Sequence, residues 1–209
     1  MRFMVHGEAL QTVDVELGGA DRIISTAPAV WMSENIDITQ AEREIVYAQG
    51  GKQRRERELF WEYGCKSVGF ITLAGSGPGR LFALQLGQEY SLVYARTSLL
   101  ACDAKVTLRG ELHPQTSRAL RKADYRLDGV SGPGFVCFSV QGNPTQYRLE
   151  TEQSVRVRLQ NLAFFEKTAS YEIIEAASQK SSGQDDLLWI VLRGPGKIWL
   201  HGIDYPFMH

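Results

Sequence analysis

The sequence predicts an all-β protein built from repeated units, and three observations support this. The tripeptide Gly-Pro-Gly occurs three times, each time between two short apolar runs. Apolar and polar residues alternate over short stretches, which is the period of a strand with one buried face. Helical periodicity is almost absent. Many short strands separated by Gly- and Pro-containing turns are typical of β-sandwiches and barrels.

The repeated tripeptides predict structural turns between strands, because proline presets φ and glycine reaches positive φ without steric cost. Their starting residues are 55 and 62 positions apart, a recurrence that indicates internal repeats. The three turns are Gly77-Pro78-Gly79, Gly132-Pro133-Gly134 and Gly194-Pro195-Gly196. We interpret each as a tight reversal of the chain.

The repeat extends upstream of each tripeptide, where apolar residues recur at matching offsets. The matching sets are Val30, Ile36 and Ile38; Leu100, Val106 and Leu108; and Phe165, Tyr171 and Ile173. Units this short bury too little surface to be stable alone, so they should pack together. We therefore expect three short β-sandwich modules, at residues 1–86, 87–141 and 142–209, arranged with pseudo-threefold symmetry in one compact unit.

The first module opens with strand signals. Residues 10–17 alternate between apolar and polar and end at Gly18-Gly19. A second strand is expected from Asp21 to Ile24, before the break at Pro28. A third apolar stretch, residues 30–32, leads to the alternating residues 36–38.

Residues 40–58 interrupt this pattern and form an insertion in the first module. Residues 40–48 predict a short helix, which Gly50-Gly51 would end. Residues 52–58 follow with four basic and two acidic side chains and no apolar stripe. We expect this run to be a solvated, net basic loop.

The second and third modules have insertions at the same place. The second module begins with a strand near residues 90–94 and has its insertion at residues 113–126. The third begins with the alternating strand 155–159, and its polar insertion covers residues 179–186. Equivalent insertions should gather on one face, and loops on a rigid scaffold are where binding residues tend to lie.

Composition narrows the class of protein. The net charge of −1 argues against a nucleic-acid binder with a globally basic surface. The three cysteines form no C-x-x-C pair, which predicts reduced, mostly buried thiols in a reducing compartment. The N-terminus lacks an apolar signal region and no apolar run is long enough to cross a bilayer, so we expect a cytoplasmic protein without a transmembrane segment.

Several segments together resemble a known family. They are Ala27-Pro28-Ala29-Val30-Trp31-Met32-Ser33 followed by Ile36-Asp37-Ile38, Leu99-Leu100-Ala101 before Val106, and Leu192-Arg193-Gly194-Pro195-Gly196-Lys197-Ile198-Trp199. Their order and spacing resemble the altered-inheritance-of-mitochondria, or mitochondrial biogenesis, family of unknown function. The resemblance implies a fold like the tryptophan RNA-binding attenuation protein, with three β-sandwich subdomains per chain. It implies no catalytic residues. The polar insertions here depart from the apolar, Gly-rich ones of that family pattern.

No motif predicts catalysis, a cofactor or a metal site. In the glycine-rich segment 75–79, Arg80 replaces the last glycine of a dinucleotide loop and Pro78 removes an N–H donor. Ser76 lacks the flanking glycines of a nucleophile elbow. The histidines are scattered, and we interpret His201 and His209 as surface residues. We expect a protein that is not an enzyme and that has no catalytic, cofactor-binding or metal-binding residues.

The strongest indication of a binding function in the sequence is the basic charge of the first two insertions. Guanidinium groups suit phosphate and carboxylate partners. The candidate anion- or partner-binding residues are Arg54, Arg55, Arg57, Arg118, Arg121, Lys122 and Arg126. The leading hypothesis is a scaffold that binds an unknown protein partner or itself, and supports assembly or envelope organisation. The alternative is nucleic-acid or anion binding through these loops.

Overall fold

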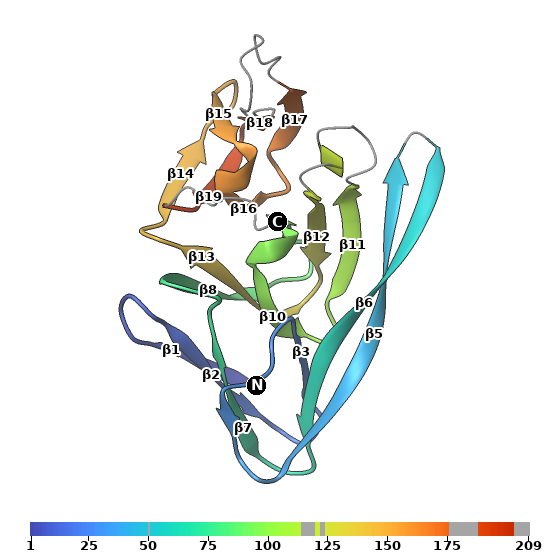
Figure 1. Cartoon of the computed structure of the whole chain (residues 1–209), viewed down its shortest axis with the longest axis vertical. Coiled ribbons are helices and arrows are strands. Elements are labelled where there is room, and N and C mark those ends of the chain that lie inside the picture. Colours follow the sequence, from blue (N-terminus) through green and yellow to red (C-terminus); the bar gives the residue numbers. More distant parts are fainter. Residues whose placement is uncertain (50, 114–119, 122–123, 176–187, 203–209) are drawn as a thin grey trace, which may run out of the picture.

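The computed structural model describes residues 1–49, 51–113, 120–121, 124–175 and 188–202, and the described residues form an all-β structure (Figure 1). Its strands belong to sheets of four, twelve and three strands. Fold class is therefore as the alternating patterns predict. No described helix is long and apolar enough to cross a membrane.

The four-stranded sheet lies at the N-terminal end of the molecule (Figure 1). Its order is β1 (Arg2–His6), β2 (Thr12–Leu17), β7 (Gly69–Ala74) and β4 (Trp31–Met32). One face of β2 and β7 is fully buried through Val13, Val15, Leu17, Ile71 and Leu73. This face packs against residues of β3, β10 and β13 in one of three apolar cores.

The twelve-stranded sheet winds through the rest of the molecule, and the three-stranded sheet lies at its far end (Figure 1). The larger sheet has the order β14 (Thr145–Leu149), β19 (Gly196–Leu200), β16 (Leu162–Glu166), β9 (Ser91–Ala95), β12 (Leu127–Ser131), β11 (Thr107–Leu112), β5 (Ile36–Gln49), β6 (Lys52–Cys65), β3 (Arg22–Ser25), β10 (Leu99–Asp103), β13 (Gly134–Gln141) and β8 (Gly79–Leu86). The smaller sheet has the order β15 (Ser154–Arg158), β18 (Leu188–Arg193) and β17 (Ser170–Glu175).

The second apolar core is built around stacked aromatic rings from β13, β16 and β19. Phe138 stacks on Phe164 with ring centroids 4.3 Å apart, and Phe164 stacks on Trp199 at 4.4 Å. All three side chains are buried. Aromatic side chains bury large areas, so this stack holds together strands that are far apart in the sequence.

The three tripeptides are turns, but the strands on either side of each do not pair with one another. β7 pairs with β2 and β4, whereas β8 pairs with β13. β12 and β18 likewise have different neighbours from β13 and β19. The turns therefore do not close hairpins between the two strands that flank them. Each tripeptide carries the chain from one group of strands to another.

Close packing explains the final glycine of the second and third tripeptides. A Cβ atom on Gly134 would lie 2.7 Å from Val106 Cγ1, and one on Gly196 would lie 2.9 Å from Thr168 Oγ1. Both distances are shorter than real Cβ contacts. The two glycines thus let the chain pass tightly over the turn that follows β10 or β16.

The strands around the second and third tripeptides pair in matching registers. Ser131 of β12 pairs with Ser91 and Thr107, while Arg193 of β18 pairs with Ser154 and Ser170. The pairs β10–β13 and β16–β19 each contain an irregularity after their first residue pair. The strands around the second and third tripeptides are therefore paired in the same arrangement.

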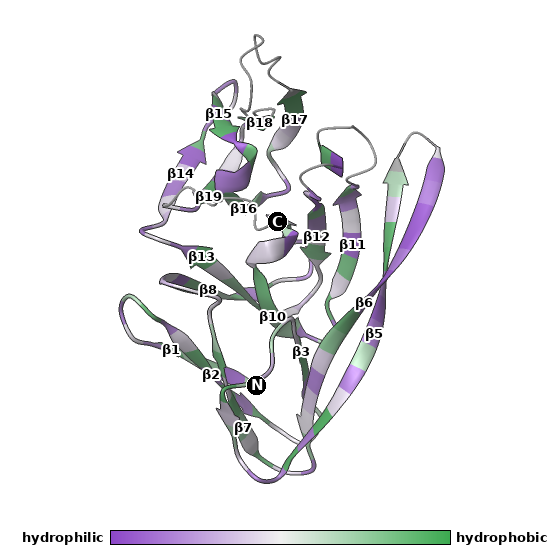
Figure 2. Ribbon diagram, viewed as in Figure 1, coloured by the Kyte–Doolittle hydropathy of each residue, from purple (hydrophilic) through white to green (hydrophobic). Residues whose placement is uncertain are grey.

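The first insertion differs from the prediction. Residues 40–48 are not helical: they lie in β5, which pairs with β6 along its whole length to form a two-stranded ribbon. Ala41, Arg43, Ile45 and Tyr47 alternate toward the protein, and this period of two was hidden among helix-favouring residues. Figure 2 shows that much of the upper half of the ribbon is hydrophilic. Most of the second insertion and all of the third lie outside the described residues.

Candidate interaction sites at the ribbon and the N-terminal sheet

The β5–β6 ribbon turns a mixed apolar and charged face toward β12 and the residues that follow β9 and β11. In its register Arg43 pairs with Glu58, Ile45 with Glu56, and Tyr47 with Arg54. Ile45 and Tyr47 are buried, and both glutamates are mostly covered. Directly opposite residues share a face. The inward face of β6 therefore carries carboxylates where an ordinary sheet would carry apolar side chains.

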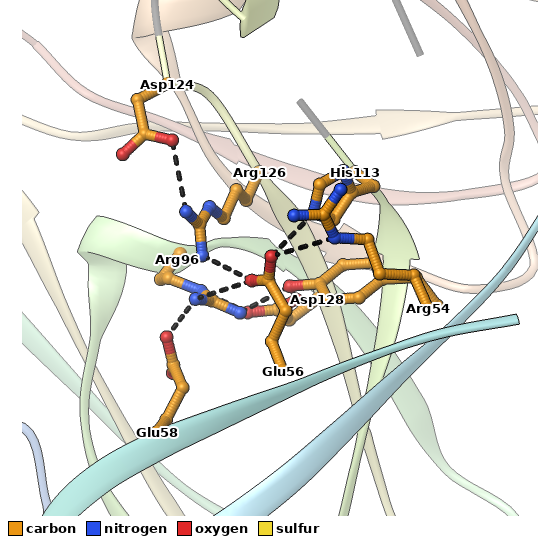
Figure 3. A network of polar contacts seen from close by, with 9 residues as sticks. Arg54, Glu56, Glu58, Arg96, His113, Asp124, Arg126 and Asp128 are labelled. Atoms are coloured by element: carbon orange, nitrogen blue, oxygen red, sulfur yellow. Dashed lines mark hydrogen bonds and ion pairs between the residues drawn. The ribbon is translucent and has the colours of Figure 1, made fainter. Parts of the chain in front are cut away.

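Glu56 is the centre of an ion-pair network under the ribbon (Figure 3). Its Oε1 lies 2.7 Å from His113 Nε2, and its Oε2 accepts a 2.6 Å hydrogen bond from Arg126. Arg54 Nε lies 3.3 Å from Oε1. Burial alone would raise the pKa of Glu56, but the contacts with His113, Arg126 and Arg96 outweigh it and lower the pKa.

A second centre of the network is Asp128, whose side chain is only 1% exposed. The Tyr47 hydroxyl donates a 2.6 Å hydrogen bond to Oδ1, and Arg96 Nε donates one of 2.8 Å to Oδ2. Arg96 also contacts Glu58 and the Tyr47 hydroxyl. Burial, and then the Asp128 charge, raise the pKa of Tyr47, so its hydroxyl stays protonated.

The Tyr47 ring is seated on a glycine of β11. Gly110 pairs with Tyr47 in the one parallel register contact between β11 and β5. A Cβ atom on Gly110 would overlap the Tyr47 ring. The ring also meets His113 edge-on, with centroids 5.0 Å apart. Gly110 thus creates the space that allows Tyr47 to reach Asp128.

A groove of about 380 Å³ lies beside this network. Its lining residues come from the chain after β3, from residues 57–60 of β6, and from the turn after β9: Thr26, Arg57, Glu58, Leu59, Phe60, Arg96, Thr97 and Leu99. β3 pairs with β6 only from Trp61 to Gly64. Among the described strands, residues 52–60 of β6 therefore pair with β5 alone, and the groove follows this open edge.

Four of the predicted basic residues form ion pairs. Arg55 pairs with Glu44 at 3.3 Å and Arg57 with Glu42 at 3.5 Å, both on the outward face of the ribbon, whereas Arg54 and Arg126 contact Glu56. Arg121 is exposed. Arg118 and Lys122 lie outside the described residues.

Glu56 joins the first insertion to the second through His113 and Arg126, so these two insertions do meet. The residues that sequence reasoning missed are the buried partners Tyr47, Glu56, Arg96 and Asp128. Their partners lie 32 to 81 positions away in the sequence. The alternation of residues 41–47 was the available signal for the ribbon.

A second exposed surface lies on the outer face of the four-stranded sheet. Across the strands, Met4 pairs with Asp14, Asp14 with Thr72, and Thr72 with Trp31, so these side chains share this face. Phe70, two positions from Thr72, lies on the same face. Trp31 is 52% exposed and Phe70 45%. Val30 and Val68 are also exposed nearby in the chain.

Burial also shifts the pKa of two cysteines and one histidine outside the network. The expectation for the cysteines is confirmed: Cys65, Cys102 and Cys137 are free and buried. Burial raises the pKa of Cys102 to about 12. His201 is not the surface residue we expected, because it is half-buried and its Nδ1 accepts a 3.0 Å hydrogen bond from the Gln141 N–H. Burial lowers its pKa to about 4. His209 lies outside the described residues.

Comparison with known proteins decides the family. The model of the mitochondrial biogenesis AIM24 family matches residues 3–202. The chain belongs to this family. The sequence resemblance is thereby confirmed. No functionally curated protein matches the sequence.

The AIM24 fold of this chain is similar to the crystal structure of a protein from Streptococcus pyogenes. The TM-score is 0.76 with 17% sequence identity, over 97% of this chain and 94% of that one. At this identity the similarity shows the fold alone. Within the described part of this AIM24 chain, no group of three or more His, Cys, Asp or Glu side chains is arranged to hold a metal ion.

Proposed function

We propose that this AIM24 protein is a non-enzymatic scaffold that binds a protein partner, and that this binding supports assembly or envelope organisation. The observation that carries the proposal is the outer face of the N-terminal sheet, where Trp31 and Phe70 are about half exposed beside the short edge strand β4. Large aromatic side chains are the residues that most often dominate the binding energy of protein interfaces.

The surroundings of these rings suit a docking surface. Met4 is 63% exposed on the same face, and the polar pair Asp14 and Thr72, joined by a 2.5 Å hydrogen bond, lies between Met4 and Trp31. Apolar anchors with polar groups beside them are typical of interfaces. Monomeric proteins seldom leave several large apolar side chains together in water, which favours a partner for this face.

The chemistry of the described polar residues supports a non-enzymatic role. Catalytic thiols need a lowered pKa, whereas burial raises the pKa of Cys102 and Cys137. The Nδ1 lone pair of His201 is occupied by a backbone N–H, and its Nε2 faces the buried Ser98 hydroxyl. Tyr47, Arg96 and Asp128 are bonded to one another.

The scaffold we propose has three modules in a pseudo-threefold arrangement, like the fold of the tryptophan RNA-binding attenuation protein. The matching registers of β9–β12–β11 and β15–β18–β17 support two equivalent modules. In the first module β7 also lies between two strands, β2 and β4. The ribbon and β1 are additions of the first module in this interpretation.

Photo-crosslinking from the proposed surface tests the function. A benzoylphenylalanine at position 70 in the full chain, expressed in its native cell, is expected to crosslink to a discrete protein. The same probe at Tyr147, which is 50% exposed on β14, serves as the control. Trp31→Ser should abolish the crosslink at position 70 while the melting temperature stays within a few degrees. Equal crosslinking from both positions, or none from position 70, would reject this surface.

A further inference from the structure

Among the described strands, β6 has an open edge that lies apart from the outer face of the N-terminal sheet. Residues 52–60 pair with β5 on one side, and β3 begins to pair with β6 on the other side only at Trp61. An unpaired strand edge presents backbone N–H and C=O groups that an added strand can bind. The groove lies along part of this edge, so there is room beside it.

The walls of the groove are suited to an extended peptide chain. Of its lining residues Phe60 is buried and Leu59 is 58% exposed, and Arg96, Thr97 and Leu99 line it as well. The inward carboxylate of Glu58 is already bound by Arg96. An added strand therefore meets no unpaired charge on the inward side, and its selectivity must come from the outward row.

The outward row of β6 contains Gln53, Arg55, Arg57 and Leu59. The side chains of Arg55 and Arg57 are 65% and 76% exposed, and their partners Glu44 and Glu42 are exposed as well. Exposed ion pairs of this kind contribute little. Both guanidinium groups are thus free to turn toward carboxylates on a new neighbouring strand, where directly opposite charges attract.

The same row disfavours a second copy of this chain. If β6 paired antiparallel with β6 of another copy near the centre of this edge, Arg55 would face Arg57 or one arginine would face itself. Like charges directly opposite one another are destabilising. A strand with acidic residues at alternate positions has no such conflict.

We propose that the edge of β6 binds an extended acidic protein segment as an added antiparallel strand. Carboxylates at positions i and i+2 of the segment lie opposite Arg57 and Arg55, and an apolar residue at i−2 lies opposite Leu59. Main-chain hydrogen bonds to residues 52–60 hold the segment, and the two arginines select it.

The test uses the full chain and a fluorescein-labelled peptide, Thr-Val-Thr-Glu-Thr-Glu-Thr, followed by fluorescence anisotropy at low and moderate salt. Saturable binding is expected, and a peptide with lysine in place of both glutamates should not bind. Arg55→Glu with Arg57→Glu should weaken binding about tenfold or more. Arg148→Glu, on the edge strand β14, is the matched control and should leave binding unchanged.

Two further measurements distinguish the mechanism. The double glutamate variant is expected to bind the lysine peptide, because its carboxylates attract the lysine side chains. Peptides with N-methyl groups at alternate residues should lose affinity, because strand pairing needs their N–H groups. No binding of the acidic peptide, or unchanged binding by the double variant, would overturn the proposal. So would binding of single-stranded RNA through Arg55 and Arg57 without binding of the peptide, a result that favours the nucleic-acid hypothesis.

Discussion

The ionic network under the ribbon and the aromatic stack in the second core hold the fold together in different ways. The stack joins β13, β16 and β19 through Phe138, Phe164 and Trp199, and it depends on buried area. The network joins the β5–β6 ribbon to β12 and to residues that follow β9 and β11 through Glu56 and Asp128, and it depends on individual atoms being in place. The stack should tolerate changes in salt and pH, whereas the network should respond to both.

The largest effect is expected from Phe164→Ala, which breaks the aromatic stack. Removing a buried ring costs about 3–5 kcal/mol of unfolding free energy. Urea denaturation at low and high salt should give the same loss, because no charge is involved. A loss that depends strongly on salt would contradict the contrast between the two regions.

Asp128→Ala should break the network at a cost of about 3 kcal/mol, because it leaves Arg96 and the Tyr47 hydroxyl without their buried acceptor. Asp128→Asn is the control, since its amide oxygen can still accept the bond from Tyr47 and should restore part of the loss. Denaturation of both variants measures this. If Asp128→Ala were neutral, the network would be dispensable for folding.

Gly110→Ala tests whether the Tyr47 ring needs the space that Gly110 leaves. The added methyl group overlaps the ring, and overpacking of this kind costs about 1–3 kcal/mol. A Cβ atom added to Gly87 would meet no other atom within 4 Å, so Gly87→Ala should be close to neutral. Thermal melting of the pair compares them, and equal melting temperatures would show that Tyr47 moves without cost.

The smallest effect is the pH dependence contributed by Glu56. Its pKa is lowered in the folded protein, so its ionised form stabilises the fold above the ordinary value of 4.5, and this stability is lost as pH falls below it. The difference in unfolding free energy between the wild type and Glu56→Gln, under about 1 kcal/mol at pH 7, should shrink toward pH 4. A constant difference from pH 7 to pH 4 would argue against this contribution.

The contrast between apolar burial and ion pairs also explains which parts of the fold could be predicted from the sequence. The alternating residues 10–17 and 155–159 and the apolar runs near each Gly-Pro-Gly turn indicated the all-β class, because burial of apolar area leaves a periodic pattern. Residues 52–58 have no apolar stripe, since their inward positions are Glu56 and Glu58. The partners of these glutamates come from Arg96, His113 and Arg126, and no local pattern connects residues so far apart in the chain.

The helix predicted for residues 40–48 fails for a related reason. Gln40, Glu42, Glu44 and Ala48 suit a helix when considered one by one. Tertiary contacts of Ile45 and Tyr47 override this preference by burying one side of a strand. The predicted basic residues Arg54, Arg55 and Arg57 therefore lie in an extended ribbon rather than in a loop.

The pairing of Gly110 with Tyr47 has a consequence for how the molecule responds to mechanical load. In the order of the twelve described strands, β11 and β5 are joined at this one residue pair, whereas every other neighbouring pair shares at least three. A pull that separates the ribbon from β11 acts on this one backbone pair and on the side-chain contacts of Glu56 and Asp128 beside it. We expect the ribbon to separate from β11 before the other neighbouring strands come apart, because those strands share more residue pairs.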